Sequence, residues 1–250
     1  MATITINRPK SLNAFNSQVL QELRRALEEI AENQDIRVLI LTGAGEKAFV
    51  AGADIGELST LNPLQARYFA KNGHAVMNKL QELPVPVIAA VNGFALGGGL
   101  EIALSCDFVY ASENAKIGLP EINLGIIPGF GGTQRLARIV GKNLAKEMIF
   151  TGKMMSAEEA GQKGIINRVL PADQLMTEVQ KTAAAMASKG RVSLNAAKKS
   201  INNGMDVDLA SGCEMEINAF ALCMASDDAK EGTSAFLEKR TPAFKAGLKG

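Results

Sequence analysis

The chain contains no tryptophan, only one histidine and only three cysteines in 250 residues, and its charges nearly cancel. With 27 Lys and Arg against 26 Asp and Glu, it lacks the basic excess typical of nucleic-acid binders. The cysteines show no metal-type spacing, and an odd number favours a reducing compartment over a disulfide scaffold. One histidine and scattered cysteines cannot supply a usual metal site. We therefore expect no metal and no nucleic-acid partner.

Long apolar runs and targeting features are also absent from the sequence. No apolar stretch approaches the roughly 20 residues that span a bilayer, so no membrane partner is expected. Residues 1–6 alternate like a strand and lack the charged and apolar regions of a signal peptide. Hydrophobic residues make up 47% of the chain, which is enough for a sizeable core. These features predict a soluble, cytoplasmic globular protein.

Strand and helix patterns alternate through the first two thirds of the sequence. Short buried strands separated by helices indicate parallel pairing with crossover helices. From residue 142 onward the pattern is almost wholly helical. We therefore expect a β/α core over residues 1–192 and a C-terminal helical region over residues 193–250. The core strands are expected at 2–6, 38–42, 85–91 and 108–111, and its main helices at 17–33 and 63–82.

A glutamate stands just inside a helix that a glycine turn opens. Residues 97–99 are all glycine and follow a predicted strand, so their backbone N–H groups can face a ligand. Glu101 lies two positions inside the helix among apolar residues, where a charge is costly unless it is paired or used. The alternative is an exposed glutamate that complements the helix dipole. The glycine spacing does not match the dinucleotide-binding fingerprint.

A second glutamate, Glu121, follows Pro120 and precedes another glycine-rich segment at 125–132. Alternatively, Glu121 is a carboxylate in a loop exposed to solvent. Two such carboxylates can act as general base and general acid on one small molecule, and nearby amides can hold a developing oxyanion. The combination suggests addition of water across an activated double bond, or the reverse reaction.

Three further residues have weaker signals. Ala53 follows a strand-like segment that ends at a glycine, so its backbone N–H could face a pocket, and Asp54 is interpreted as the cap of the next turn. His74 lies in a helical pattern and is interpreted as structural or exposed. A Ser-His-Asp hydrolase would require this histidine, and no Gly-x-Ser-x-Gly elbow accompanies it.

Five separated motifs resemble, in order, those of the enoyl-CoA hydratase (crotonase) family. They cover residues 7–14, 49–55, 86–99, 128–136 and 236–240, so the resemblance runs nearly the whole length. It implies an α/β fold, a spiral of ββα units with a C-terminal helical region that trimerises, commonly as a dimer of trimers. It also implies a coenzyme A thioester as substrate, and no separate cofactor, because coenzyme A is part of that substrate.

The resemblance implies a hydro-lyase of fatty-acid β-oxidation in which two glutamates and two amides carry the reaction. The N–H groups of Ala53 and Gly98 would hold the thioester oxygen, Glu101 would activate water, and Glu121 would protonate the α-carbon. Segments 42–47 and 130–132 resemble bacterial short-chain members, which favours interconversion of crotonyl-CoA and 3-hydroxybutyryl-CoA.

Other substrate contacts are implied by position alone. Ala51, Asp54 and Ile55 would contact the thioester, and Gly129 would line the acyl pocket. Phe220 and Lys239 would contact coenzyme A from the C-terminal region, with Lys239 near its phosphates. The sequence departs from the family pattern at Gly56, which replaces a common lysine, and at Leu119, where glutamine is frequent.

Two kinds of alternative remain open at the level of sequence. An enoyl-CoA isomerase of the same fold could use one carboxylate to move a proton between carbons, and product analysis would separate it from a hydratase. An RNA-binding relative would need a basic patch, which a net charge of +1 disfavours. A non-catalytic coenzyme A-binding relative is disfavoured by the presence of both glutamates.

Overall fold

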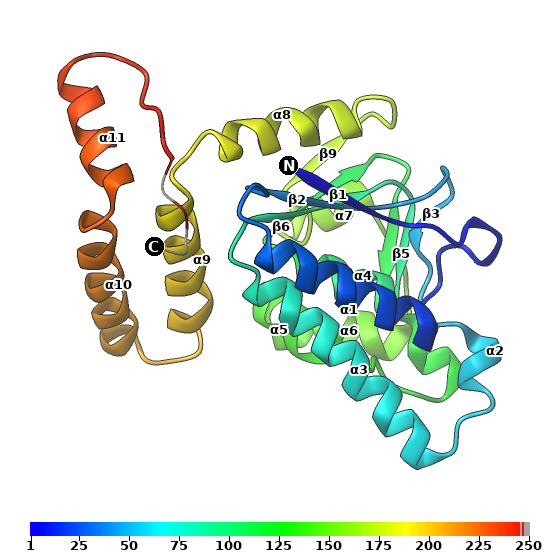
Figure 1. The fold of residues 1–250 in the computed structure, drawn as a ribbon. Coiled ribbons are helices and arrows are strands. Elements are labelled where there is room, and N and C mark those ends of the chain that lie inside the picture. Colours follow the sequence, from blue (N-terminus) through cyan, green and yellow to red (C-terminus); the bar gives the residue numbers. More distant parts are fainter. Residues whose placement is uncertain (246, 248–250) are drawn as a thin grey trace.

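The computed structural model describes residues 1–245 and 247 and contains two β-sheets surrounded by helices (Figure 1). The larger sheet is parallel throughout, and the smaller one is parallel except where β8 joins β7. In spatial order, the larger sheet consists of β1 (Ala2–Ile6), β2 (Leu39–Gly43), β4 (Val87–Val91), β6 (Phe108–Ser112) and β9 (Arg168–Leu170). The smaller sheet consists of β3 (Ala48–Val50), β5 (Phe94–Leu96), β7 (Lys116–Gly118) and β8 (Met155–Ser156).

Successive turns of the chain place one strand in each sheet and then add helical structure. Strands β2 and β3 lead to α2 (Ile55–Leu58) and α3 (Pro63–Glu82), and β4 and β5 lead to α4 (Gly98–Ala103). Parallel neighbours need such crossover connections. The chain therefore forms the spiral of ββα units that the family resemblance implies. After β6 and β7 come the 3-10 helix η2 (Pro120–Leu124), α5 (Gly132–Val140) and α6 (Lys142–Thr151).

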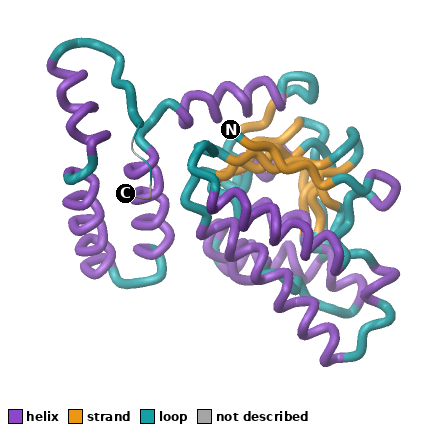
Figure 2. The backbone as a smooth tube through the Cα atoms, viewed as in Figure 1, coloured by secondary structure: helices purple, strands orange, loops and turns teal. Residues whose placement is uncertain are grey.

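Different helices cover the two faces of the larger sheet, because side chains alternate along each strand. Leu39 and Leu41 point into the main core, which α1 (Ser17–Glu32) and α3 close. Ile40 and Ile88 point the other way, into a smaller core with α8 (Leu175–Ala187). Figure 2 shows α1 and α3 on one side of the strands and α8 on the other.

The C-terminal part of the described chain consists of α9 (Arg191–Gly204), α10 (Leu209–Met224) and α11 (Asp227–Leu237), while the shorter α7 (Ala157–Gln162) leads to β9. A buried cation fixes α9 to the core. The Lys198 ammonium donates to the carbonyl oxygens of Leu80 and Val85 at 3.2 and 3.1 Å and lies 3.0 Å from Asp107 Oδ2. Helix α10 packs along α9, and none of its residues is buried. The division of the chain at residue 192 stays a prediction.

Most helices agree with the sequence patterns, whereas the shortest elements do not follow from them. Helix α3 begins and ends at the predicted residues, and β1 does the same. Strands β5, β7, β8 and β9 were not expected, because two or three residues are too few for alternation to be visible. Helix α5 was also missed, within a segment notable mainly for its glycines. No helix in the described part of the chain is long and apolar enough to cross a membrane.

Candidate active site

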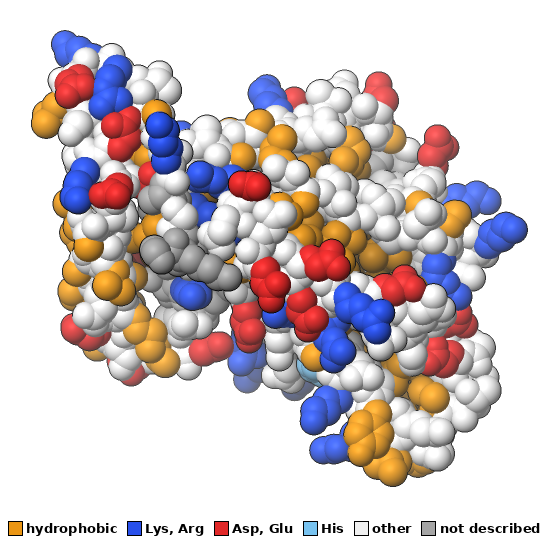
Figure 3. Space-filling model, viewed as in Figure 1, with side chains coloured by type: hydrophobic (Ala, Val, Ile, Leu, Met, Phe, Trp, Pro, Cys, Tyr) orange, Lys and Arg blue, Asp and Glu red, His pale blue; other side chains and the backbone are white. Residues whose placement is uncertain are grey.

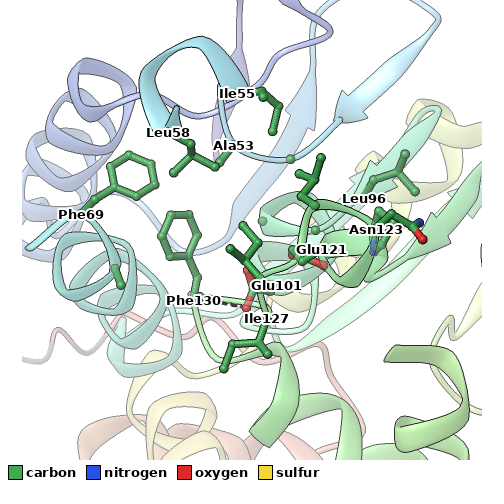
Figure 4. A pocket seen from close by; sticks show the side chains of 18 of the residues that line it. Ala53, Ile55, Leu58, Phe69, Leu96, Glu101, Glu121, Asn123, Ile127 and Phe130 are labelled. Carbon is green, nitrogen blue, oxygen red and sulfur yellow. Dashed lines mark hydrogen bonds between the residues drawn. The ribbon is translucent and has the colours of Figure 1, made fainter. Parts of the chain in front are cut away.

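A cavity of about 710 Å³ lies where the turns after β3, β5 and β7 meet α2 and α3 (Figure 4). These three strands are parallel neighbours in the smaller sheet, so their carboxyl ends lie side by side at the same end of the sheet. Four residues singled out from the sequence line the cavity together: Ala53, Gly98, Glu101 and Glu121. Much of the remaining lining is apolar and includes Leu58, Phe69, Leu96, Ile127 and Phe130.

The backbone around Ala53 leaves its amide free of the neighbouring strand. The Phe15 N–H donates to the Gly52 carbonyl at 2.8 Å, and the Asp54 N–H donates to the Phe15 carbonyl at 2.7 Å. Successive amides of an extended chain point to opposite sides. The Ala53 N–H therefore points away from Phe15, while Ala53 itself lines the cavity.

Gly98 is the first residue of α4, where helical N–H groups have no partner within the helix. The preceding Gly97 has φ 50° and ψ −122°, a conformation that favours glycine. A Cβ at Gly97 would lie 2.7 Å from Glu121 Oε1. The turn thus requires glycine for its conformation and for the close approach of Glu121, and it places the first amides of α4 at the cavity.

Glu101 is buried, with only 1% of its surface exposed, so the alternative of an exposed dipole partner is wrong. Its Oε1 accepts hydrogen bonds from the amides of Phe130 at 2.8 Å and Gly132 at 2.7 Å, the first of which is drawn in Figure 4. Burial raises the pKa of this carboxyl, while the two amides and the positive charge of Arg135 oppose the rise. The carboxyl is therefore held by one oxygen in a fixed orientation at the cavity.

Glu121 belongs to η2, and its carboxyl faces the same cavity without comparable anchors. Its Oε2 is buried and has no hydrogen-bond partner among the described residues. Burial raises the pKa of Glu121 to about 7, and the negative charge of Glu101 contributes to the rise. Near neutral pH this carboxyl is thus partly protonated, so it can donate a proton to a molecule in the cavity.

The remaining predicted contacts divide into two groups. Ala51, Ile55 and Gly129 line the cavity. Asp54, Phe220 and Lys239 are not among its lining residues. Asp54 caps α2 by accepting from the Gly56 N–H at 3.1 Å, as the sequence predicts, and it also forms a 3.0 Å ion pair with Arg8.

Phe220 on α10 and Lys239, just beyond α11, belong to the helices at the opposite side of the molecule from α2 (Figure 1). Phe220 is 67% exposed, and the side chain of Lys239 is exposed as well. Within one chain these two residues therefore lie away from the cavity.

Several residues of the site were not given roles from the sequence. The amides of Phe130 and Gly132 hold Glu101, and the side chain of Arg135 donates to the Phe130 carbonyl at 3.1 Å. Phe69 reaches the cavity from α3 and packs its ring 5.4 Å from that of Phe130. The glycine-rich composition of segment 125–132 is a signal for exposed amides, but nothing in it specifies Glu101 as their acceptor.

The ββα spiral brings two carboxyls and two amide-bearing turns to one apolar cavity, an arrangement that general acid–base chemistry on a carbonyl compound can use. The family model described as enoyl-CoA hydratase/isomerase matches residues 1–247. The chain belongs to this family, and the resemblance inferred from the motifs is confirmed.

Individual relatives match over nearly their full lengths. A crotonyl-CoA hydratase of Syntrophomonas wolfei is 46% identical over 98% of this chain and 94% of its own. A short-chain-enoyl-CoA hydratase of Clostridium acetobutylicum is 48% identical over 96% of this chain and 92% of its own. A crystal structure of an enoyl-CoA hydratase from Bacillus anthracis has a TM-score of 0.95 at 45% identity, covering 97% of this chain and 94% of that one. The fold expected from the sequence is therefore confirmed.

Proposed function

We propose that the protein is a short-chain enoyl-CoA hydratase that adds water reversibly to a trans-2-enoyl thioester such as crotonyl-CoA. Family membership and the two hydratases named above support this reaction. The observation that carries it is the pair of carboxyls at one cavity, with Glu101 anchored by two amides and Glu121 left with a buried, unpartnered oxygen.

The proposed chemistry divides the work between amides and carboxyls. The thioester oxygen accepts from the N–H groups of Ala53 and Gly98, which stabilise the enolate-like charge that develops as water adds. Loss of one such donor typically costs about 2.7–4 kcal/mol in the barrier. The reaction requires no separate cofactor, because the coenzyme A portion enters and leaves with the substrate.

The two carboxyls have different tasks in this proposal. Since Glu101 Oε1 already accepts two amide hydrogens, we assign Oε2 to the attacking water. As the water oxygen bonds to the β-carbon, Glu101 takes the water proton, and Glu121, whose burial raises its pKa to about 7, gives its own proton to the α-carbon. Proton exchange with solvent then returns both carboxyls to their starting states. In the dehydration direction the same groups exchange roles.

A short acyl chain fits the apolar wall of the cavity. Phe69 and Phe130 pack against each other at its side, and both rings are largely buried. Because such an aromatic pair adds about 0.5–1.5 kcal/mol beyond its buried area, we infer that this wall limits the length of the acyl chain. The names of the two bacterial relatives, one acting on crotonyl-CoA and one on short-chain enoyl-CoA, agree with this preference.

We further propose that the protein assembles as a trimer or a dimer of trimers through its C-terminal helices. Hydrophobic side chains gather along α10 and α11, as Figure 3 shows at the left of the molecule. Leu209, Leu222 and Phe236 are 83%, 73% and 82% exposed in the single chain. Such surfaces are typical of subunit interfaces. In this arrangement Phe220 and Lys239 would reach the coenzyme A bound by a second copy.

Light scattering tests the assembly, because the mass in solution should be three or six times that of one 26.5 kDa chain. A monomer at micromolar concentration would contradict it. We also propose a cytoplasmic location, which the three unpaired cysteines support.

The reaction itself is tested by following the conjugated-thioester absorbance of crotonyl-CoA and identifying the product by mass. A rapid fall in absorbance with a gain of one water is the expected result. Glu101→Gln and Glu121→Gln should each keep the fold and lose roughly 100-fold or more in turnover. The matched control is Glu29→Gln, an exposed glutamate on α1. An unchanged absorbance, with movement of the double bond in a 3-enoyl-CoA, would instead identify an isomerase.

A further inference from the structure

Arg135 in α5 connects the loop that holds Glu101 to a separate helix. Its Nη1 donates to the Phe130 carbonyl at 3.1 Å, and its Nη2 donates to Asn78 Oδ1 at 2.9 Å and Gln81 Oε1 at 3.3 Å on α3. One planar guanidinium thus joins the loop to α3 from two of its nitrogens. The carbonyl and the amide of Phe130 therefore have different partners, Arg135 on one side and Glu101 on the other.

The backbone between the guanidinium and Glu101 is built for close approach. Gly131 has φ 107°, and a Cβ at this position would lie 2.2 Å from Arg135 Nη1. The Gly132 amide that follows donates to Glu101 Oε1 at 2.7 Å. The guanidinium therefore lies directly against the short segment whose amides hold the carboxyl.

Arg135 does not line the 710 Å³ cavity, so it is placed to act on Glu101 and not on the substrate. It borders a second cavity of about 520 Å³ together with His74, Arg138 and Asp206. The positive charge of Arg135 opposes the rise that burial causes in the pKa of Glu101.

The charged and titratable groups facing this pair come from three elements. Glu121 of η2 faces Glu101, while His74 of α3 and Arg138 of α5 face Arg135. Partial burial, reinforced by the charge of Arg135, lowers the pKa of His74, whose side chain is otherwise exposed.

We propose that Arg135 is a positioning residue for Glu101: its guanidinium holds the Phe130–Gly132 amides in place against Oε1 and favours the charged carboxylate. The inference rests on the proposed function, because it takes Glu101 as the group that activates water. Holding the amides in place depends on the planar guanidinium, which donates from two nitrogens in different directions. Favouring the charged carboxylate depends only on the positive charge of Arg135. The two effects can therefore be separated by substitution.

Arg135→Met removes both the hydrogen-bonding guanidinium and the positive charge. Arg135→Lys keeps the charge but not the guanidinium. With crotonyl-CoA, Arg135→Met should lose roughly 10- to 100-fold in kcat, with KM changed much less than kcat, since Arg135 itself does not line the cavity. The acid limb of its kcat/KM profile should move up by about 0.5 to 1 pH unit. Arg135→Lys should lose kcat without that movement. The matched control, Arg138→Met, removes an exposed arginine one turn further along α5 and should change neither.

A second measurement needs no turnover. The protein is labelled with carbon-13 at the glutamate side-chain carboxyls, and the Glu101 signal is assigned by its loss in Glu101→Gln. Its titration should move upward in Arg135→Met and stay unchanged in Arg138→Met. An unmoved titration, or wild-type kcat in a folded Arg135→Lys, overturns the positioning role. Absence of hydration by the unmodified protein would overturn the proposed function instead, and the titration would still decide whether Arg135 controls Glu101.

Discussion

Glu121 should destabilise the folded protein at alkaline pH, and replacing it with glutamine should remove that cost. Burial raises the pKa of this carboxyl from its ordinary value of 4.5 to about 7. Between these values the folded chain binds a proton that the unfolded chain has largely lost, so the folded state loses stability as pH rises. The cost is absent well below pH 4.5 and complete above about pH 7. Glutamine has nearly the same shape and carries no charge at any pH.

The magnitude follows from the size of the pKa change. The rise from 4.5 to about 7 corresponds to about 3 kcal/mol at 1.36 kcal/mol per pKa unit. Water that enters the open cavity screens the charge of this half-buried side chain, which reduces the expected value to about 1–2 kcal/mol. For an effect of this reduced size, roughly half is already present at pH 5. Glu121→Gln should therefore be more stable than the parent by about 1–2 kcal/mol at pH 8 and by about half as much at pH 5.

The assay is urea denaturation of parent and variant at both pH values, at one fixed protein concentration. Glu29→Gln serves as the control, because this exposed carboxyl should give no pH-dependent difference. Contributions from the other carboxyls cancel between parent and variant, except that of Glu101, whose charge interacts with that of Glu121. Equal stability of the parent and Glu121→Gln at pH 8, or the same gain at pH 5 and pH 8, would refute the conclusion that Glu121 is held in a neutral form by burial.

Three further predictions concern pH, packing and a buried ion pair. Because Glu121 must hold a proton to act as the acid, kcat/KM for hydration should decline above about pH 7, and a profile that stays flat to pH 9 would contradict that role. Gly99→Ala should destabilise the fold by about 1–3 kcal/mol in urea denaturation, because the new Cβ would lie 1.9 Å from the Val50 carbonyl oxygen. Gly129→Ala, with nothing within 4 Å of the added atom, should change stability by less than about 0.5 kcal/mol. Lys198→Met leaves the Asp107 carboxylate without its 3.0 Å partner and should cost about 3 kcal/mol, part of which Asp107→Asn in the same chain should restore.

The sequence was most informative where the pattern extends over many residues. The 20-residue helix α3 and the fully buried, mainly apolar strand β2 have enough periodicity or apolar length to be recognised in isolation. Glu101 and Glu121 were recognised because a carboxylate among apolar residues beside glycine turns is costly without a use. Their placement at one cavity, however, depends on the smaller sheet, whose strands have only two or three residues.

What the sequence did not specify is the set of contacts made by backbone atoms. Nothing in the residue types indicates that the Phe130 and Gly132 amides converge on one oxygen of Glu101. The attachment of Arg135 to Asn78 and Gln81 joins residues more than fifty positions apart, so local patterns cannot predict it. The positions assigned to Phe220 and Lys239 came from resemblance alone, and in one chain these residues lie away from the cavity.

The order of the strands in the smaller sheet bears on how this site could change during evolution. Ala53, Gly98 and Glu121 follow β3, β5 and β7, so each is supplied by a different turn of the spiral. Glu101 stands one helical turn beyond Gly98. A substitution at Glu121 can therefore alter the proton chemistry while the amides of Ala53 and Gly98 keep their places. Such independence would let a single replacement change the reaction without first disturbing the amides that are proposed to hold the thioester.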